Sequence, residues 1–143
     1  MKVKDILVQK GSLVRTIGPD QSVRDAIRTL VEHRIGSLLV TEGGRILGII
    51  TERDILREAC HHAGRLDKRQ VSEAMTGDLI VGVPDDDLSY VMGIMTKNKI
   101  RHLPILDGRE LRGIISIGDV VWASMTETEF ENRNLKEYIT GTY

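Results

Sequence analysis

Two copies of one short pattern have the chemistry to bind an anion beside a sugar. Residues 48–54 read Gly-Ile-Ile-Thr-Glu-Arg-Asp, and residues 113–119, 65 positions later, read Gly-Ile-Ile-Ser-Ile-Gly-Asp. In each copy an apolar run ends at a hydroxyl residue, which predicts the start of a helix. The N–H groups and the positive dipole end of a helix start favour a phosphate. The aspartate three residues later could accept hydrogen bonds from ribose hydroxyls, so each copy predicts half of a nucleotide site.

The same residues also have an interpretation that needs no ligand. Thr51 with Asp54, and Ser116 with Asp119, are each spaced as a capping box, in which the two side chains bond each other's backbone N–H groups. A single copy would favour capping alone. The duplicated context favours binding as well, and the two roles are compatible because the hydroxyl can cap the helix when the site is empty.

Composition narrows the class of protein. A chain of 143 residues makes one ordinary domain, or two small units that share a core, and with 3% aromatic residues that core must be aliphatic. The net charge of −1 gives no global field for nucleic acid or an anionic membrane. We find no apolar run near the roughly 20 residues that a membrane helix needs, and no apolar segment of a signal peptide at the start. With Cys60 as the single cysteine, we expect a reducing, cytoplasmic location.

Hydrophobic periodicity and turn residues outline the elements of each half. The first half predicts an amphipathic start at 3–8, a strand at 13–17, a helix at 22–34, a hairpin of strands 36–40 and 45–50, and a helix from 51 to about 64. In this last helix we expect Ile55, Leu56 and Ala59 to face the core.

The second half repeats the first. From Pro19 and Pro84 onward the two halves align at an offset of 65 without a gap, which predicts duplication of one folding unit. We predict an α+β fold of two β-α-β-β-α repeats packed sheet to sheet about a pseudo-twofold axis, with a cleft at each hydroxyl-to-aspartate junction. The predicted organisation is repeat 1 at 1–64, a polar linker at 65–70, repeat 2 at 71–125 and a C-terminal helical tail at 126–143.

The tail has no counterpart after the first repeat. Its apolar residues recur at helical spacing, namely Phe130, Leu135, Tyr138 and Ile139. Such a stripe usually packs against something, and because the two-repeat core is already closed, we expect a second copy of the chain. The sequence therefore predicts a homodimer.

These motifs resemble a tandem pair of CBS (cystathionine-β-synthase) domains, also called a Bateman module, over residues 3–125. The family signature of two hydrophobic residues, Ser or Thr, two residues of any type and Asp is similar to residues 49–54 and to residues 114–119. Residues 101–105, Arg-His-Leu-Pro-Ile, resemble the second, proline-ended strand signature. The Thr-Glu-Arg-Asp and Ser-Ile-Gly-Asp forms are similar to those of stand-alone bacterial members.

The resemblance implies a regulatory module that holds adenosine derivatives (AMP, ADP, ATP, NAD or S-adenosylmethionine) between the repeats. It implies that the aspartates bind ribose, that strand backbone reads adenine, and that Arg101 and His102 face the phosphate. The first copy has Gly36-Ser37 at that place, where Arg53 is the alternative cation, so we expect unequal affinities. The implied ligand contacts are Thr16, Ile17, Ser37, Leu38, Thr51, Arg53, Asp54, Val81, Arg101, His102, Leu103, Pro104, Ser116 and Asp119.

Other kinds of site have weaker support. Cys60-His61-His62 lacks a second cluster for a metal and a partner that would activate the thiol, and Asp85-Asp86-Asp87 fits an acidic helix start better than a Mg²⁺ site. We therefore expect a sensor of adenine nucleotides, not an enzyme, with no metal and possible signalling to a protein partner. The alternatives are a structural protein-interaction module without nucleotide and an NAD-linked redox enzyme.

Overall fold

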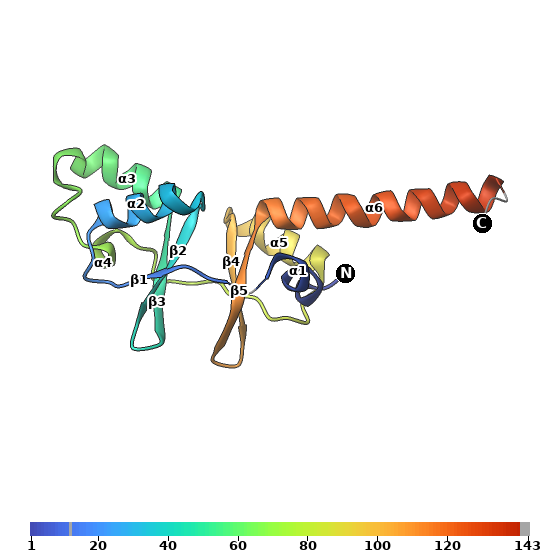
Figure 1. The fold of residues 1–143 in the computed structure, drawn as a ribbon, viewed down its shortest axis with the longest axis horizontal. Helices are drawn as coiled ribbons and strands as arrows, with labels where there is room; N and C mark the ends of the chain where they lie inside the picture. Colours follow the sequence, from blue (N-terminus) through green and yellow to red (C-terminus); the bar gives the residue numbers. More distant parts are fainter. Residues whose placement is uncertain (12, 141–143) are drawn as a thin grey trace. The chain divides into compact units, whose positions relative to one another are not determined.

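The computed structural model describes the backbone of residues 1–11 and 13–140, and side chains as far as residue 128. It divides into two compact units (Figure 1). The first unit is Val14–Leu79, and the second unit joins Met1–Leu13 to Ile80–Tyr143. Each is described by itself below.

The first unit has a three-stranded sheet in the order β1-β2-β3. Strand β1 (Thr16–Ile17) pairs in parallel with β2 (Ser37–Glu42), which forms an antiparallel hairpin with β3 (Arg45–Thr51). Helices α2 (Val23–His33) and α3 (Glu52–His62) lie along one side of the sheet (Figure 1). A 3₁₀ turn, η1 (Ala63–Arg65), and the short helix α4 (Val71–Ala74) follow.

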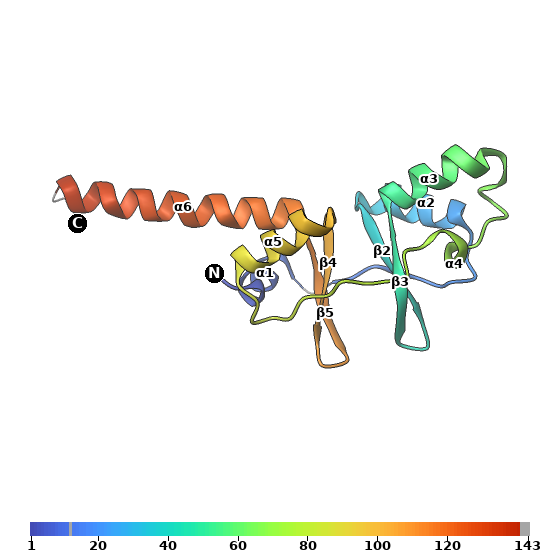
Figure 2. The same ribbon diagram turned by 180° about the vertical axis from the view of Figure 1, so that it is seen from behind.

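The second unit repeats this plan around the antiparallel hairpin of β4 (His102–Asp107) and β5 (Glu110–Ser116). Helices α1 (Val3–Lys10) and α5 (Leu88–Asn98) lie on the same side of the hairpin, and α6 (Ile117–Thr140) starts where β5 ends (Figure 2). The counterpart of β1 is only a parallel bridge from Gly82 to Ile105. The reason is Pro104: it has no N–H, so it cannot make the bond that Leu39, its counterpart, donates to the Arg15 carbonyl over 3.2 Å.

The two halves agree in backbone detail, which confirms the predicted duplication. Arg34 and Lys99 end α2 and α5 in the left-handed region, at φ of 53° and 54°. Gly43 and Gly108 turn the two hairpins at φ of 60° and 63°, values that glycine adopts without steric cost. The α+β fold and the two repeats follow the prediction, whereas the packing of one sheet on the other stays a prediction.

The compact units do not coincide with the sequence repeats, because each unit takes its leading helix from the start of the other repeat. Helix α1 precedes the first repeat, yet Val3 and Ile6 are buried in the core of the second unit. Helix α4 precedes the second repeat, yet Val71 and Ala74 are buried in the core of the first. The predicted repeat boundaries at 1–64 and 71–125 stay a prediction, and the structural units differ from them because their first helices are exchanged.

Two local predictions differ from the structure. The strand expected at 13–17 is limited to Thr16–Ile17. In α3 two of the three expected inward positions are wrong: Ile55 packs against the core, but Leu56 is 70% exposed and Ala59 is exposed. The acidic residues Asp54 and Glu58 are buried instead. Both carboxylates have hydrogen-bond partners inside the unit, and these contacts offset the free-energy cost of burying a charge.

The predicted helical tail is confirmed as helix up to Thr140, since α6 continues through it. The side chains of Phe130, Leu135, Tyr138 and Ile139, the predicted dimer stripe, lie outside the described residues. None of the described helices combines the length and the apolar character that crossing a membrane requires.

Candidate functional site

The first hydroxyl-to-aspartate junction forms a complete capping box at the start of α3. The Thr51 backbone N–H donates to Asp54 Oδ2 over 2.9 Å, and the Asp54 backbone N–H is 3.5 Å from Thr51 Oγ1. The Thr51 hydroxyl also donates to Asp54 Oδ2 over 3.1 Å. The first N–H of the helix, that of Glu52, donates to the Gly36 carbonyl. This helix start therefore uses several of its donors within the chain.

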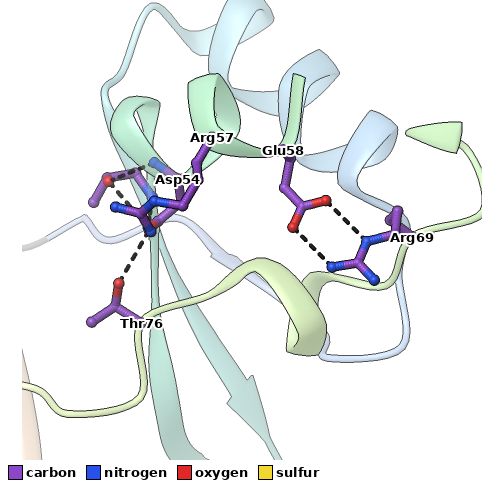
Figure 3. A network of polar contacts seen from close by, with 6 residues as sticks. Asp54, Arg57, Glu58, Arg69 and Thr76 are labelled. Carbon is purple, nitrogen blue, oxygen red and sulfur yellow. Dashed lines mark hydrogen bonds and ion pairs between the residues drawn. The ribbon is translucent and has the colours of Figure 1, made fainter. Parts of the chain in front are cut away.

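The second oxygen of the same carboxylate is occupied as well. Asp54 Oδ1 accepts from Thr76 Oγ1 over 3.1 Å and from Arg57 Nη1 over 3.3 Å (Figure 3). Asp54 is 3% exposed. A ribose could bind this carboxylate only if it replaced one of these partners.

The second junction caps α6 in the same way but is more open. The Ser116 N–H donates to Asp119 Oδ2 over 2.8 Å, and the Asp119 N–H donates to Ser116 Oγ over 3.1 Å. The Asp119 side chain is 26% exposed, against 4% for Asp54. Its additional partner is a cation: Lys10 Nζ lies 2.6 Å from Asp119 Oδ2.

A cavity of about 270 Å³ adjoins Asp119. It lies between α1 and α6 of the second unit, and its lining consists of Ile6, Gln9, Lys10, Asp119 and Trp122. The residues supply a carboxylate, an amide, an ammonium group and an exposed indole. Such a set can hydrogen-bond a sugar and stack on a flat ring.

The environment of Asp119 keeps its carboxylate ionised. Burial, the largest single influence, acts to raise its pKa, but the hydrogen bond from Lys10, the Ser116 backbone N–H and the charge of Lys10 together lower the pKa below its ordinary value of 3.8. A charged carboxylate is an acceptor only, which suits the donor hydroxyls of a ribose.

The other candidate contacts of the first unit lie close to this junction. Ser37 is the register partner of Thr51 across β2 and β3, and Thr16 pairs with Leu39 on the other side of β2. Ile17 and Leu38 are buried in the core, so they can offer a ligand only backbone groups. Arg53 is exposed on the first turn of α3.

The second unit places its candidates in the matching way. His102 is the register partner of Ser116, directly after the exposed Arg101. The side chains of Leu103 and Pro104 are buried, and Val81 is exposed beside the bridge residue Gly82. The structure thus brings His102, Ser116 and Asp119 together around the start of α6.

Sequence reasoning missed three residues of the exchanged segments and one of α6. Lys10 and Thr76 each reach the aspartate of the unit into which their segment packs. Gln9 of α1 and Trp122 of α6 line the cavity.

The sequence contained a signal for this exchange. Residues 3–7 align with residues 71–75 at an offset of 68, whereas from Pro19 and Pro84 onward the halves align at an offset of 65. That shift separates each leading segment from the repeat it precedes.

The described side chains do not assemble a metal centre. Among residues 1–11 and 13–128, no three His, Cys, Asp or Glu side chains are grouped so as to hold a metal ion. Cys60 is exposed, and the rings of His61 and His62 meet edge to face with centroids 6.5 Å apart.

Comparison with known proteins identifies the family. The sequence profile of the CBS domain matches the chain twice, at residues 3–61 and 71–126. The chain belongs to the CBS domain family. It carries a tandem pair, and both matches include a hydroxyl-to-aspartate junction.

Individual CBS proteins are similar along most of the chain. The mitochondrial CBS domain-containing protein CBSX3 of Arabidopsis thaliana is 36% identical over 129 residues, which cover 87% of this chain and 63% of that protein. The crystal structure of the CBS-domain protein ATU1752 from Agrobacterium tumefaciens is 41% identical, with a TM-score of 0.84, and the match covers 87% of this chain and 99% of that one. The CBS domain pair of protein MJ0100, solved with 5′-methylthioadenosine and S-adenosyl-L-methionine, is 28% identical, with a TM-score of 0.77 and coverage of 89% and 98%.

Proposed function

We propose that this CBS pair is a regulatory module that binds an adenine nucleotide, AMP, ADP, ATP or NAD, through its duplicated hydroxyl-to-aspartate junctions. The observation that carries the proposal is Asp119, an ionised and partly exposed carboxylate at a helix start, beside a cavity. A similar CBS pair, that of MJ0100, holds two adenosine compounds. These ligands share adenine and a ribose with two adjacent hydroxyls.

The second junction is the stronger candidate of the two. Asp119 is more accessible than Asp54, and Arg101 and His102 stand at the start of β4, beside the start of α6. These side chains offer charge-assisted hydrogen bonds to a phosphate, which Gly36 and Ser37 cannot supply at the matching place. We therefore propose that the Asp119 site fills first and that Asp54 contributes a weaker site.

A thermal unfolding series tests the proposal. At about one hundred times its dissociation constant, a ligand should stabilise the protein by about 2.7 kcal/mol and raise the midpoint on the order of 10 °C. Asp119→Ala should lose this shift, whereas Asp54→Ala should retain most of it. No shift of the wild type with AMP, ADP, ATP, NAD or 5′-methylthioadenosine would contradict the proposal.

Asp25 offers a matched control. It closes a third capping box with Ser22 at the start of α2, where its backbone N–H donates to Ser22 Oγ over 3.0 Å. Asp25→Ala should cost about 1 kcal/mol of unfolding free energy, as loss of a cap does, and leave the ligand-induced shift unchanged. A shift that was lost equally in Asp25→Ala and Asp119→Ala would mean that the aspartates act only as caps.

A second candidate function has an observation of its own. Three large apolar side chains on α6 are exposed, Val121 at 45%, Trp122 at 60% and Met125 at 66%. This face supports the alternative of a protein-interaction module, with a homodimer or another regulated protein as the partner. Light scattering of Trp122→Ser with Met125→Ser tests it: a change from dimer to monomer would place a second copy on this face.

We propose no catalytic role. Incubation of the purified protein with NAD, followed by chromatography of the nucleotide, tests this point, since conversion of NAD would reveal an enzyme. The expected cytoplasmic location also stays a prediction, and one similar protein is mitochondrial.

A further inference from the structure

One residue in each unit connects the edge of the hairpin to the candidate aspartate. In the first unit this residue is Thr76: its N–H donates to the Ile49 carbonyl over 2.8 Å and its hydroxyl donates to Asp54 over 3.1 Å. In the second unit Lys10 makes both contacts with one ammonium group, to the Ile114 carbonyl over 2.7 Å and to Asp119 over 2.6 Å.

The two arrangements contact equivalent targets, although Thr76 and Lys10 are not counterparts in the alignment of the leading segments. Ile49 and Ile114 are 65 residues apart, as are Asp54 and Asp119. Thr76 and Lys10 both belong to the exchanged segments, Thr76 just after α4 and Lys10 at the end of α1. In both units the exchanged segment therefore ends on the carboxylate that the proposed function assigns to ribose.

The chemistry of the two contacts differs. The Thr76 hydroxyl is a neutral donor to an aspartate that is almost fully buried. Lys10 is a cation whose side chain is 37% exposed, so water can replace its contacts at a modest cost. The contact in the second unit is thus the one that a ligand can open more easily.

We propose that Lys10 is a latch on the Asp119 site: it holds the carboxylate while the site is empty, and an adenosine ligand that bonds both oxygens of Asp119 displaces it. This inference rests on the proposed function and adds a regulatory role for α1. A ribose that bonds both oxygens of Asp119 through its two adjacent hydroxyls needs an acceptor site on Oδ2, and Oδ2 already accepts from Ser116 and Lys10. Lys10 also lines the cavity beside Asp119.

Displacement of the latch changes the end of α1. Lys10 is the last residue of this helix, and Gly11, at φ of 90°, ends it with an N–H bond of 2.8 Å to the Leu7 carbonyl. Without the contacts of Lys10 to Ile114 and Asp119, this last turn loses its two polar links to β5 and α6. Ligand occupancy thereby loosens the end of α1, and by linkage any partner that holds this end against β5 weakens ligand binding by the same factor.

Calorimetric titration with 5′-methylthioadenosine tests the latch. This probe has no phosphate, so a lysine cannot attract it by charge. Lys10→Met removes the ammonium group, keeps most of the apolar stem and should bind the probe about threefold to tenfold more tightly, because no ion pair has to be broken. Lys4→Met is the matched control: Lys4 lies on the same helix and pairs with Asp85 over 3.0 Å, and its loss should leave the affinity unchanged.

The outcomes separate the latch from the proposed function. Binding that requires Asp119 but is unchanged or weaker in Lys10→Met overturns the latch and leaves the function standing. The same titration with AMP reveals a Lys10 that contacts phosphate instead, since Lys10→Met would then weaken AMP binding, which also overturns the latch. Absence of binding of either ligand by both the wild type and Lys10→Met overturns the function and the latch together.

Hydrogen exchange gives a readout that does not depend on affinity. In the wild type with saturating 5′-methylthioadenosine, the amides at the end of α1, including that of Gly11, should exchange faster than in the free protein. In Lys10→Met they should exchange fast with or without the probe. Equal or slower exchange at the end of α1 in the loaded wild type would contradict the displacement of Lys10.

Discussion

Glu58 is a buried carboxylate of α3 that lies away from the candidate site. Arg69 donates to both of its oxygens, from Nε and Nη2, over 3.0 Å each (Figure 3). Arg69 also donates to Glu73. This fork geometry makes the pair strong and specific. Because Arg69 precedes α4, the pair ties α3 to the segment that the second repeat contributes to the first unit.

Glu58→Gln should destabilise the protein by about 1–3 kcal/mol, because it removes the charge that both guanidinium nitrogens of the partly buried Arg69 contact and leaves Glu73 as the remaining acidic partner. The midpoint of urea unfolding measures the effect. Arg112→Gln removes an exposed partner of Asp107 at 3.1 Å and should cost less than about 1 kcal/mol. Equal costs for the two variants would show that Glu58 behaves as a surface group.

The same pair predicts how stability depends on pH. The hydrogen bond from Arg69 is the main cause that lowers the pKa of Glu58 below its ordinary value of 4.5, against the opposing effect of burial. The unfolded chain therefore takes up this proton at a higher pH than the folded protein does, and the stabilisation is complete above about 4.5 and lost as the pH falls below it. The difference in unfolding free energy between wild type and Glu58→Gln should be constant from pH 7 to 5 and shrink toward pH 3. A difference that grows on acidification would contradict this assignment.

At the scale of elements, two glycines let the exchanged segments approach the hairpins. A Cβ on Gly48 in β3 would lie 2.6 Å from the Thr76 carbonyl oxygen and 2.9 Å from the Met75 sulfur. A Cβ on Gly113 in β5 would lie 2.7 Å from the tip of Leu7. The duplicated glycine of the sequence motif thus marks the place where a segment of the other repeat packs.

The two glycines should respond differently to alanine. Gly48→Ala meets a backbone carbonyl that cannot move alone and should cost about 1–3 kcal/mol, whereas Gly113→Ala meets the end of a flexible side chain and should cost less. Chemical denaturation measures both. In the second unit, Leu7→Ala should make room, so the double variant Leu7→Ala with Gly113→Ala should be less destabilised than the sum of the single variants. Additive costs would mean that Leu7 does not limit the space.

At the scale of the whole molecule, the exchange of leading helices gives each unit a core residue from the other repeat. Val3 and Val71 are both fully buried, Val3 in the second core and Val71 in the first. They are matched in type and in position within their segments. Substitutions of Val3 and Val71 therefore probe the stability of the second and the first unit separately.

Val3→Ala and Val71→Ala should each cost about 2–3 kcal/mol through the cavity they leave, but in different places. Hydrogen exchange should show that Val3→Ala lowers the protection of β4 and β5, and that Val71→Ala lowers that of β2 and β3. If Val3→Ala lowered the protection of β2 and β3 instead, the assignment of α1 to the second unit would be contradicted. A uniform loss in both variants would mean that the units unfold as one.

The parts of this fold that the sequence predicted are those that local chemistry determines. The helix starts at Ser22, Thr51 and Ser116, and the turns at Gly43 and Gly108, follow from capping and backbone freedom over a few residues. The parts that were missed depend on distant pairs. Asp119 is 109 positions from Lys10, so no local pattern could indicate this contact.

Side-chain burial in α3 was missed for a related reason. Periodicity favours apolar residues as the inward face, and Leu56 fits that rule better than Glu58 does. Glu58 is nevertheless buried because Arg69 neutralises it, and a counter-ion 11 positions away in a loop is invisible to a helical pattern. The candidate site was likewise predicted by residue type, whereas its occupancy by Thr76 and Lys10 was not.

The exchange of leading helices also sets an order of events during synthesis. Residues 14–79 form a continuous unit, so all of its segments are present as soon as they have left the ribosome. Helix α1 emerges before this unit, but its partners in β5 and α6 appear only about a hundred residues later, a delay of roughly 5–20 s at ordinary rates of translation. Over that interval Val3 and Ile6 have no core to enter, so a chaperone that binds short apolar segments has its best opportunity at helix α1.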